Sequence, residues 1–168
     1  IDAKIGGRIA KLVKRGDLRG KTGDAVLLTD VTGAPCERII VLGLGTKGAF
    51  KRKQYRKALA SALGMLARTG AKDAVSYLAL DEFANADAYQ QARIVVEAVT
   101  ASQYRIPDHK TSNKKPKPSL AQFGIAVAER GDKSKVARGF EHGQGIVSGM
   151  GLVGGLGHHP GHVCTPGY

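Results

Sequence analysis

Short apolar runs alternate with longer segments of helical periodicity along this chain, and that alternation constrains its fold more than any other feature. Residues 25–29 (AVLLT), 38–44 (RIIVLGL), 75–80 (VSYLAL) and 120–128 are apolar and too short for core helices. They are therefore predicted to be strands. The connection between the first two contains Thr32-Gly33-Ala34-Pro35, which is typical of a turn. These two strands are expected to form a hairpin-like pair.

Helical spacing marks the segments between the strands. Residues 3–14, 52–69 and 87–103 each place apolar side chains on one helical face, and Gly16 and Gly70 are positioned to end the first two. Asp87 or Asn85 is expected to cap the third. The alternation predicts an α/β fold with a mixed central sheet and helices on both of its faces.

The last part of the chain, residues 131–168, is expected to be separate from an α/β domain at 1–130. It opens with a helical candidate from 133 to about 153, yet nine glycines lie between Gly139 and Gly161. Each glycine inside a helix costs roughly 1 kcal/mol relative to alanine. Such a helix is expected either to be held by packing against another element or to fray.

Composition indicates a soluble globular protein with an anionic partner. The chain is 42% apolar and 24% charged, and its formal net charge is +12. Nucleic acid is the first such partner to consider; the alternatives are a solvated basic surface or one part of a larger, more acidic protein. No apolar run approaches the length of a membrane span, and no signal peptide is visible. Two cysteines, Cys36 and Cys164, fit a reducing, cytosolic setting.

Two basic clusters are the candidate nucleic-acid contacts. The first surrounds the start of the helix predicted at 52–69, where cations oppose the helix dipole and a bound anion would relieve that penalty. The second lies in the proline-punctuated loop 108–119. Aromatic residues are only 5% of the chain, so contacts to backbone phosphates are expected, and solubilising lysines are the alternative reading. The candidates are Lys47, Lys51, Arg52, Lys53, Arg56 and Lys57, with Lys110, Lys114, Lys115 and Lys117.

A G-x-G-x-x-G pattern follows the second predicted strand, from Gly43 through Gly45 to Gly48. A dinucleotide site requires this turn to lead directly into a helix, with an acid about 20 residues further on. Here the helical pattern begins only near Arg52, and Asp81 comes too late. The glycines are instead expected to form a tight exit from the strand, where a side chain would clash.

No catalytic group is signalled by the residues. Carboxylates are few and scattered, and no serine lies in a nucleophile-elbow motif. Three imidazoles and a thiol, at His158, His159, His162 and Cys164, resemble metal donors, but their spacing matches no structural zinc pattern. We expect a loose tail there, and no catalytic or metal-binding residue in the chain.

Several stretches, in order, resemble the N-terminal domain of the leucyl aminopeptidases. They are Gly7-Arg8-Ile9, the run from Lys14 to Lys21 (KRGDLRGK), the run from Glu37 to Gly45 (ERIIVLGLG), Tyr55-Arg56-Lys57-Ala58-Leu59, Tyr104-Arg105, and the closing Val163-Cys164-Thr165-Pro166 with Tyr168. The resemblance covers essentially the whole chain. The sequence departs from the family pattern at its end, with Gly154-Gly155-Leu156, His158, Pro160 and His162.

The resemblance implies a macro-domain-like N-terminal domain and an interdomain helix of a cytosolic metallopeptidase. Such enzymes form homohexamers and release N-terminal amino acids from peptides with two divalent metals (zinc, manganese or magnesium). Their catalytic residues lie in a larger C-terminal domain, so none maps onto this chain. Some bacterial members also bind DNA, which the basic clusters would suit. A nucleotide-binding module of macro-domain type is a third reading, based on fold analogy alone.

Overall fold

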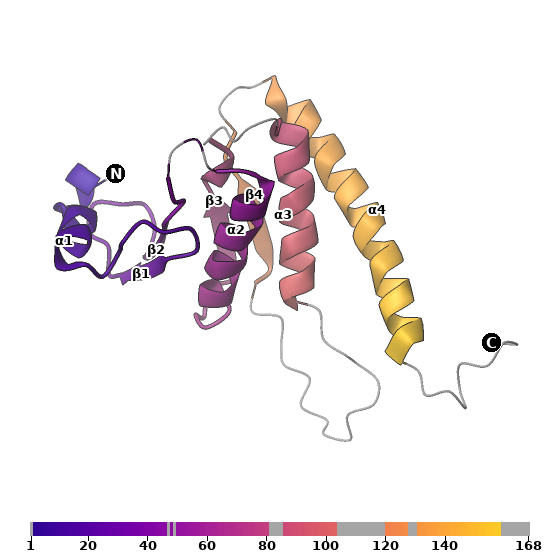
Figure 1. Cartoon of the computed structure of the whole chain (residues 1–168), viewed down its shortest axis with the longest axis horizontal. Coiled ribbons are helices and arrows are strands. Elements are labelled where there is room, and N and C mark those ends of the chain that lie inside the picture. Colours follow the sequence, from indigo (N-terminus) through magenta and orange to yellow (C-terminus); the bar gives the residue numbers. More distant parts are fainter. Residues whose placement is uncertain are drawn as a thin grey trace, which may run out of the picture. The chain divides into compact units, whose positions relative to one another are not determined.

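The computed structural model of the chain describes residues 2–46, 48, 50–80, 86–103, 120–127 and 131–158. These residues form two compact units. The first holds the described residues up to 75 together with 86 and 120–124, and the second holds 76–80, 87–103, 125–127 and 131–158. Both helices and strands are present, so the predicted α/β class is confirmed (Figure 1). The domain boundary at residue 130 stays a prediction.

The first unit begins with a short 3₁₀ helix, Asp2–Ile5, and helix α1, Arg8–Arg15. Gly16 ends α1 as predicted, because it adopts a left-handed conformation and donates its N–H to the carbonyls of Leu12 and Val13. Strands β1 (Ala25–Thr29) and β2 (Arg38–Leu42) then pair antiparallel, with Ala25 opposite Leu42. The predicted hairpin-like pair is therefore confirmed. Its apolar side chains meet those of α1 in a small core around Ile5, Leu28 and Val31.

Helix α2, Arg52–Leu66, contacts both β1 and β2. Tyr55, Ala58, Leu59 and Leu63 recur at helical spacing and are buried, with Tyr55 fully inaccessible to solvent. The Tyr55 ring meets Phe50 edge to face, with 6.2 Å between the ring centroids. The buried side of α2 therefore faces the rest of the first unit, including the β1–β2 pair.

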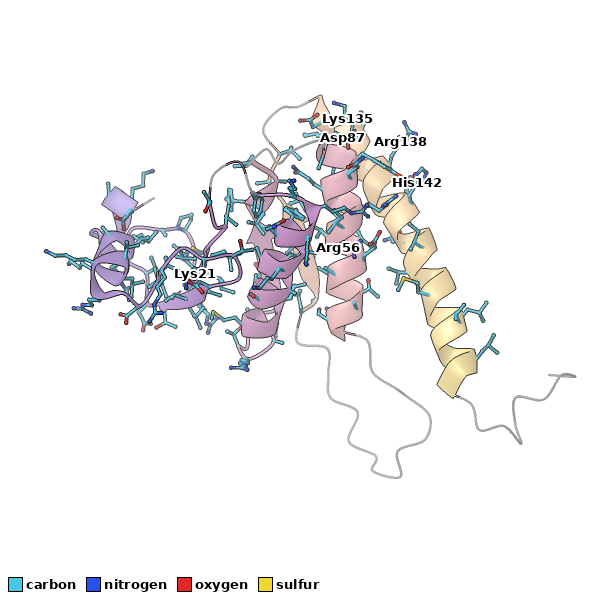
Figure 2. The ribbon with its side chains drawn as sticks, in the orientation of Figure 1. Lys21, Arg56, Asp87, Lys135, Arg138 and His142 are labelled. Atoms are coloured by element: carbon cyan, nitrogen blue, oxygen red, sulfur yellow. The ribbon has the colours of Figure 1, made fainter. Side chains whose placement is uncertain are left out.

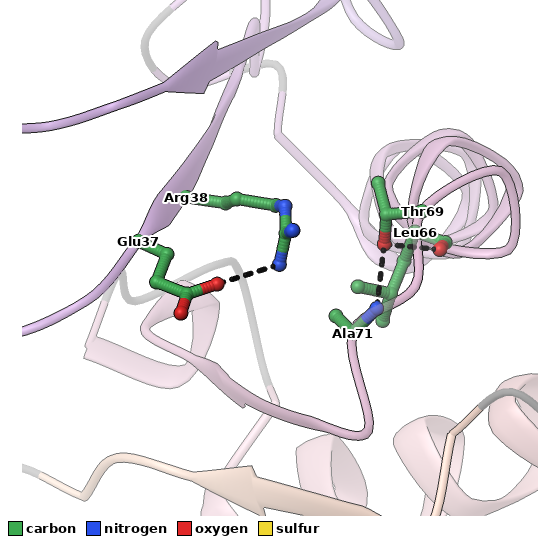
Figure 3. A network of polar contacts seen from close by, with 5 residues as sticks. All are labelled: Glu37, Arg38, Leu66, Thr69 and Ala71. Atoms are coloured by element: carbon green, nitrogen blue, oxygen red, sulfur yellow. Dashed lines mark hydrogen bonds and ion pairs between the residues drawn. The ribbon is translucent and has the colours of Figure 1, made fainter.

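The end of α2 differs from the prediction. The helix was expected to reach Gly70, but its last helical residue is Leu66. The Thr69 hydroxyl donates to the Leu66 carbonyl at 2.7 Å and accepts the Ala71 N–H at 3.3 Å (Figure 3). A side-chain turn thus replaces the helical hydrogen bonds before glycine is reached. The same figure shows the Glu37–Arg38 ion pair at the start of β2.

Strands β3 (Asp73–Ser76) and β4 (Gln122–Ile125) form a second two-stranded sheet. The Gln122 N–H donates to the Lys72 carbonyl and the Ala126 N–H to that of Ser76, so the bonds advance in the same direction along both strands and the pair is parallel. The predicted strand 75–80 is wrong beyond Ser76. Residues Leu78–Leu80 form a 3₁₀ turn, because the Ser76 hydroxyl accepts the Leu78 N–H.

The predicted single central sheet is replaced, in the part of the chain that the structure describes, by these two separate pairs, β1–β2 and β3–β4. The strands predicted from apolar runs are present, although β4 is shorter than expected. Pairing between them was the part that the runs did not specify. The α/β character comes from four helices that alternate with these strands.

The second unit is dominated by helices α3, Ala88–Gln103, and α4, Asp132–His158. Of the two caps predicted for α3, the structure shows Asp87, since its carboxylate accepts the Gln90 N–H at 2.9 Å. Ala92, Ile94 and Val95 of α3 are almost completely buried. Helices α3 and α4 contact each other near their starts and diverge toward their C-terminal ends (Figure 1).

Two glycines bring α4 close to α3. A Cβ on Gly139 would lie 2.5 Å from the Tyr89 carbonyl oxygen and 2.8 Å from the Ala92 Cβ. A Cβ on Gly143 would lie 2.9 Å from the Val96 Cβ. Contacts that advance together along both helices mean that α3 and α4 run parallel. The glycine-rich helix is thus held by packing, one of the two outcomes expected from the sequence.

Candidate functional site

The first basic cluster gathers at the start of α2. Lys51 is the N-cap residue, and Arg52, Lys53, Arg56 and Lys57 lie within the first six residues of the helix. All five side chains are exposed. At 100° per residue, the four helical cations fall within an arc of about 140°, and Arg52 and Arg56 border the buried side of the helix at Leu63. The structure therefore places the described members of the predicted cluster together at the start of α2, where Figure 2 labels Arg56.

The electrostatics of this helix start favour an anion. The first turn of α2 contains no acidic residue. The Lys51 N–H donates to the Gln54 side-chain oxygen at 3.2 Å, but a lysine side chain cannot accept a hydrogen bond in return. The remaining N–H groups of the first turn carry the positive end of the helix dipole, and the cations add to it. The result is a positive potential with no acidic residue of the first turn to offset it.

An open pocket of about 530 Å³ lies beside Gln54. It is lined by Arg19, Gly20, Lys21, Thr22, Gly45, Thr46 and Gln54. Backbone hydrogen bonds build it, from the Gly45 N–H to the Gly20 carbonyl at 2.8 Å and from the Gly23 N–H to the Gly43 carbonyl at 3.1 Å. The Thr22 hydroxyl adds a bond of 3.0 Å to the Leu44 carbonyl.

The pocket contributes two cations, Arg19 and Lys21, that were not among the predicted site residues. Lys21 is labelled in Figure 2. Both side chains are exposed. Both residues come from a segment some 30 residues before α2. The hydrogen bonds between the 20–23 turn and the 43–45 turn hold this segment at the pocket beside Gln54. The sequence signal for these two cations is the basic run from Lys14 to Lys21, which carries part of the family resemblance but was not predicted to be a binding site.

The glycine pattern after β2 serves this turn-to-turn contact. A Cβ on Gly43 would clash with the Lys21 carbonyl, and one on Gly45 would clash with the Thr22 hydroxyl. Helix α2 begins at Arg52, well after Gly48. The interpretation of these glycines as a tight strand exit is confirmed. The geometry lacks the direct strand-to-helix turn that holds a pyrophosphate.

The other predicted positions lie outside the described residues. These are Lys47, the loop lysines Lys110, Lys114, Lys115 and Lys117, and the His-Cys segment His159, His162 and Cys164. His158 ends α4, but its side chain is also undescribed. Among the residues with described positions, no group of three or more His, Cys, Asp or Glu side chains is placed to hold a metal ion. None of the described helices combines the length and apolar character needed to cross a membrane.

Comparison with known proteins decides the relationship. Residues 1–113 match the N-terminal domain that defines the cytosol aminopeptidase family. The chain belongs to this family. A probable cytosol aminopeptidase of Pseudomonas syringae pv. tomato is 35% identical over the whole chain, and one of Halorhodospira halophila is 30% identical. The chain spans only 34% of the length of either relative.

Solved structures agree on the fold of this cytosol aminopeptidase family member. A mutant of tomato leucine aminopeptidase matches 99% of the chain with a TM-score of 0.76 at 19% identity, and the match covers 31% of that enzyme. The bottromycin maturation enzyme BotP, in complex with Mn, matches 92% of the chain with a TM-score of 0.66 at 21% identity. The matched fold is thus part of larger enzymes.

Proposed function

We propose that this chain is the non-catalytic N-terminal part of a metal-dependent aminopeptidase that releases N-terminal amino acids from peptides. The observation that carries the proposal is the match of residues 1–113 to the N-terminal domain of the cytosol aminopeptidase family. The relatives are about three times longer, which leaves room for a separate catalytic domain. The parent protein would act in the cytoplasm as a homohexamer.

The metal chemistry belongs to the part of the parent that follows this chain. One structural neighbour carries Mn, and the family resemblance implies two divalent ions, zinc, manganese or magnesium. The described residues do not fit such a pair, because they offer no cluster of carboxylate, imidazole or thiolate donors. We therefore assign no metal ligand and no chemical step to the residues of this chain.

The chain by itself is expected to leave peptides intact. The test is incubation of the purified 168-residue chain with leucine p-nitroanilide and Mn²⁺. The intact Pseudomonas relative, assayed under the same conditions, serves as the positive control. Release of p-nitroaniline by this chain, at a rate above the buffer blank and lost on adding a chelator, would contradict the proposal.

A second function, binding of DNA through backbone phosphates, is favoured by the positive start of α2. Five exposed cations surround a helix terminus without an acid in its first turn, and Arg19 and Lys21 line the pocket beside it. Such a surface suits phosphates, and contacts to phosphates position a protein on DNA without reading its sequence. Lys47 and the loop lysines Lys110, Lys114, Lys115 and Lys117 are proposed as further phosphate contacts because of their charge.

A salt titration tests this second function. Binding through phosphates makes log K fall steeply as log salt rises, by about 0.9 per phosphate contact. Replacing Lys51, Arg52 and Lys53 by Ala is expected to weaken binding to all sequences alike and to reduce the slope by up to about 3. The matched control replaces Lys4, Lys11 and Lys14, three exposed lysines of the 3₁₀ helix and α1, and removes the same charge. Equal effects of the two triple variants would refute a specific surface on α2.

A further inference from the structure

The second half of α4 exposes large apolar side chains. Met150 is 63% exposed and Val153 is 70% exposed, and Ile146 one turn earlier is 40% exposed. Leu152 and Leu156 are also exposed, at 68% and 40%. A helix in a globular protein normally turns such residues toward a core and keeps polar residues outside. This half of α4 therefore has a face suited to contact with another surface.

The exposed residues continue the line along which α4 packs on α3. Gly139, Gly143, Ile146, Met150 and Val153 are separated by alternating steps of four and three residues. That spacing places them on one seam of a helix, as in helices that pack lengthwise. The first two positions are buried against Ala92 and Val96 of α3, and the last three are not buried. By this register Met150 is level with Gln103, the last residue of α3.

Charge is missing from the same stretch. Residues 142–158 contain no Asp, Glu, Lys or Arg, in a chain in which these make up 24% of residues. Glycines 149, 151, 155 and 157 leave open space where a Cβ would be, which allows another backbone to approach closely. An uncharged, glycine-rich, apolar surface fits a protein partner better than it fits water, nucleic acid or lipid headgroups.

We propose that this seam, Ile146, Met150 and Val153, is the docking surface for the catalytic region of the same polypeptide. The inference rests on the proposed function. The matched family domain is N-terminal and the relatives are about three times longer, so most of their remaining length follows the matched residues. Helix α4 is the last described element, and a domain joined just beyond it is held near the seam at a high effective concentration. A modest apolar surface then suffices for stable contact.

Hydrogen exchange of the amides in 146–156 measures whether the seam is covered. One sample is the 168-residue chain, and the other is the same chain joined to the part of the Pseudomonas relative that follows the matched residues. We expect these amides to exchange about tenfold more slowly in the joined protein. Amides near Gly139, already packed on α3, are expected to change little.

A pair of charge substitutions makes the test specific. Met150→Glu in the joined protein is expected to remove most of the added protection, because it places a charge in the contact. Gln144→Glu is the matched control, since Gln144 is exposed on the opposite side of α4 and adds the same charge. In the chain alone, neither substitution is expected to change the helical circular dichroism signal, because neither side chain is buried.

The outcomes separate the two proposals. Unchanged exchange at 146–156 in a joined protein that cleaves leucine p-nitroanilide would overturn the docking surface and leave the proposed function standing. Slow exchange already present in the chain alone, with a dimer in sedimentation, would overturn it in favour of a second copy. Loss of protection by Gln144→Glu as much as by Met150→Glu would also overturn it. Peptide cleavage by the chain alone would remove the proposed function itself.

Discussion

Helices α2 and α4 are stabilised in opposite ways. Helix α2 is 15 residues long and buries Tyr55, Ala58, Leu59 and Leu63. Helix α4 is 27 residues long, yet its buried positions are Gly139 and Gly143, where no side chain exists. The first helix gains stability from the apolar area that it removes from water. The second gains it from the close approach of two backbones, which any added atom would prevent.

The contrast shows that the length and glycine content of a helix do not predict its stability unless its packing is also known. Helix α4 is the richest in glycine of the described helices and is nevertheless the longest of them. Its first half is anchored by α3, including a 2.9 Å hydrogen bond between the Tyr89 hydroxyl and His142 Nδ1. Helix stability in proteins comes mostly from tertiary contacts, and α4 divides into a part that has them and a part open to a partner.

The largest effect on stability is expected from truncating a buried side chain of α2. Leu59 is 1% exposed, so Leu59→Ala is expected to lower the free energy of unfolding by roughly 2–5 kcal/mol, measured by urea denaturation. Leu152→Ala on α4 is the matched control and is expected to change it by less than about 0.5 kcal/mol, because Leu152 is 68% exposed. Similar losses at both positions would break the comparison.

The second-largest effect is expected from alkaline pH, which should lower the free energy of unfolding through Tyr55 of α2. Burial raises the pKa of Tyr55 from 10.0 to about 12. Because the folded protein holds this proton more tightly than the unfolded chain, its contribution is complete below pH 10 and is lost between about pH 10 and 12. The loss amounts to roughly 2–3 kcal/mol. Urea denaturation of the wild type and of Tyr55→Phe across this pH range measures the loss due to Tyr55. Parallel pH profiles of the unfolding free energy in the two proteins would argue against this contribution.

Adding one methyl group at the α3–α4 contact is expected to have a smaller cost. Gly139→Ala would press a Cβ against the Tyr89 carbonyl and the Ala92 Cβ. Overpacking of roughly 1–3 kcal/mol outweighs the gain of about 1 kcal/mol in helix propensity. A net loss of up to about 2 kcal/mol in the urea experiment is therefore expected. A gain in stability would show that the two backbones are not in close contact.

The smallest effect is expected at the other end of α4, with the opposite sign. Nothing lies within 4 Å of a Cβ built on Gly151. Gly151→Ala is expected to stabilise the helix by up to about 1 kcal/mol, seen as increased helicity in circular dichroism. The same methyl group would thus destabilise at Gly139 and stabilise at Gly151. Destabilisation at both would mean that the second half of α4 is already in contact with something.

Sequence periodicity was sufficient for the elements whose pattern is repeated several times. The spacing of Tyr55, Leu59 and Leu63 predicted the buried side of α2, and Asp87 was one of the two residues predicted to cap α3. The limits of elements were less predictable where a single hydroxyl competes with the backbone. Thr69 ends α2 before Gly70, and Ser76 turns the chain before Leu80, because local side-chain bonds replace helical and strand bonds.

The candidate site was predictable to the extent that its residues are neighbours in sequence. Helical spacing alone places Arg52, Arg56 and Lys57 together on the exposed side of α2. Arg19 and Lys21 reach the adjacent pocket through bonds between two distant turns, and no local pattern encodes such a contact. The same limit explains why apolar runs predicted the strands and not their division into two pairs.

The two sheets also differ in how soon each can assemble. Only residues 30–37 separate β1 from β2, whereas residues 77–121 separate β3 from β4. Closing the longer loop costs about 1.5 kcal/mol more chain entropy. During synthesis on a ribosome, β1 and β2 can pair once Leu42 has emerged. Strand β3 can pair with β4 only after Ile125 has emerged. A growing chain therefore carries β3 without β4 while residues 77–125 are added, and the backbone groups of β3 are open to non-native pairing during that interval.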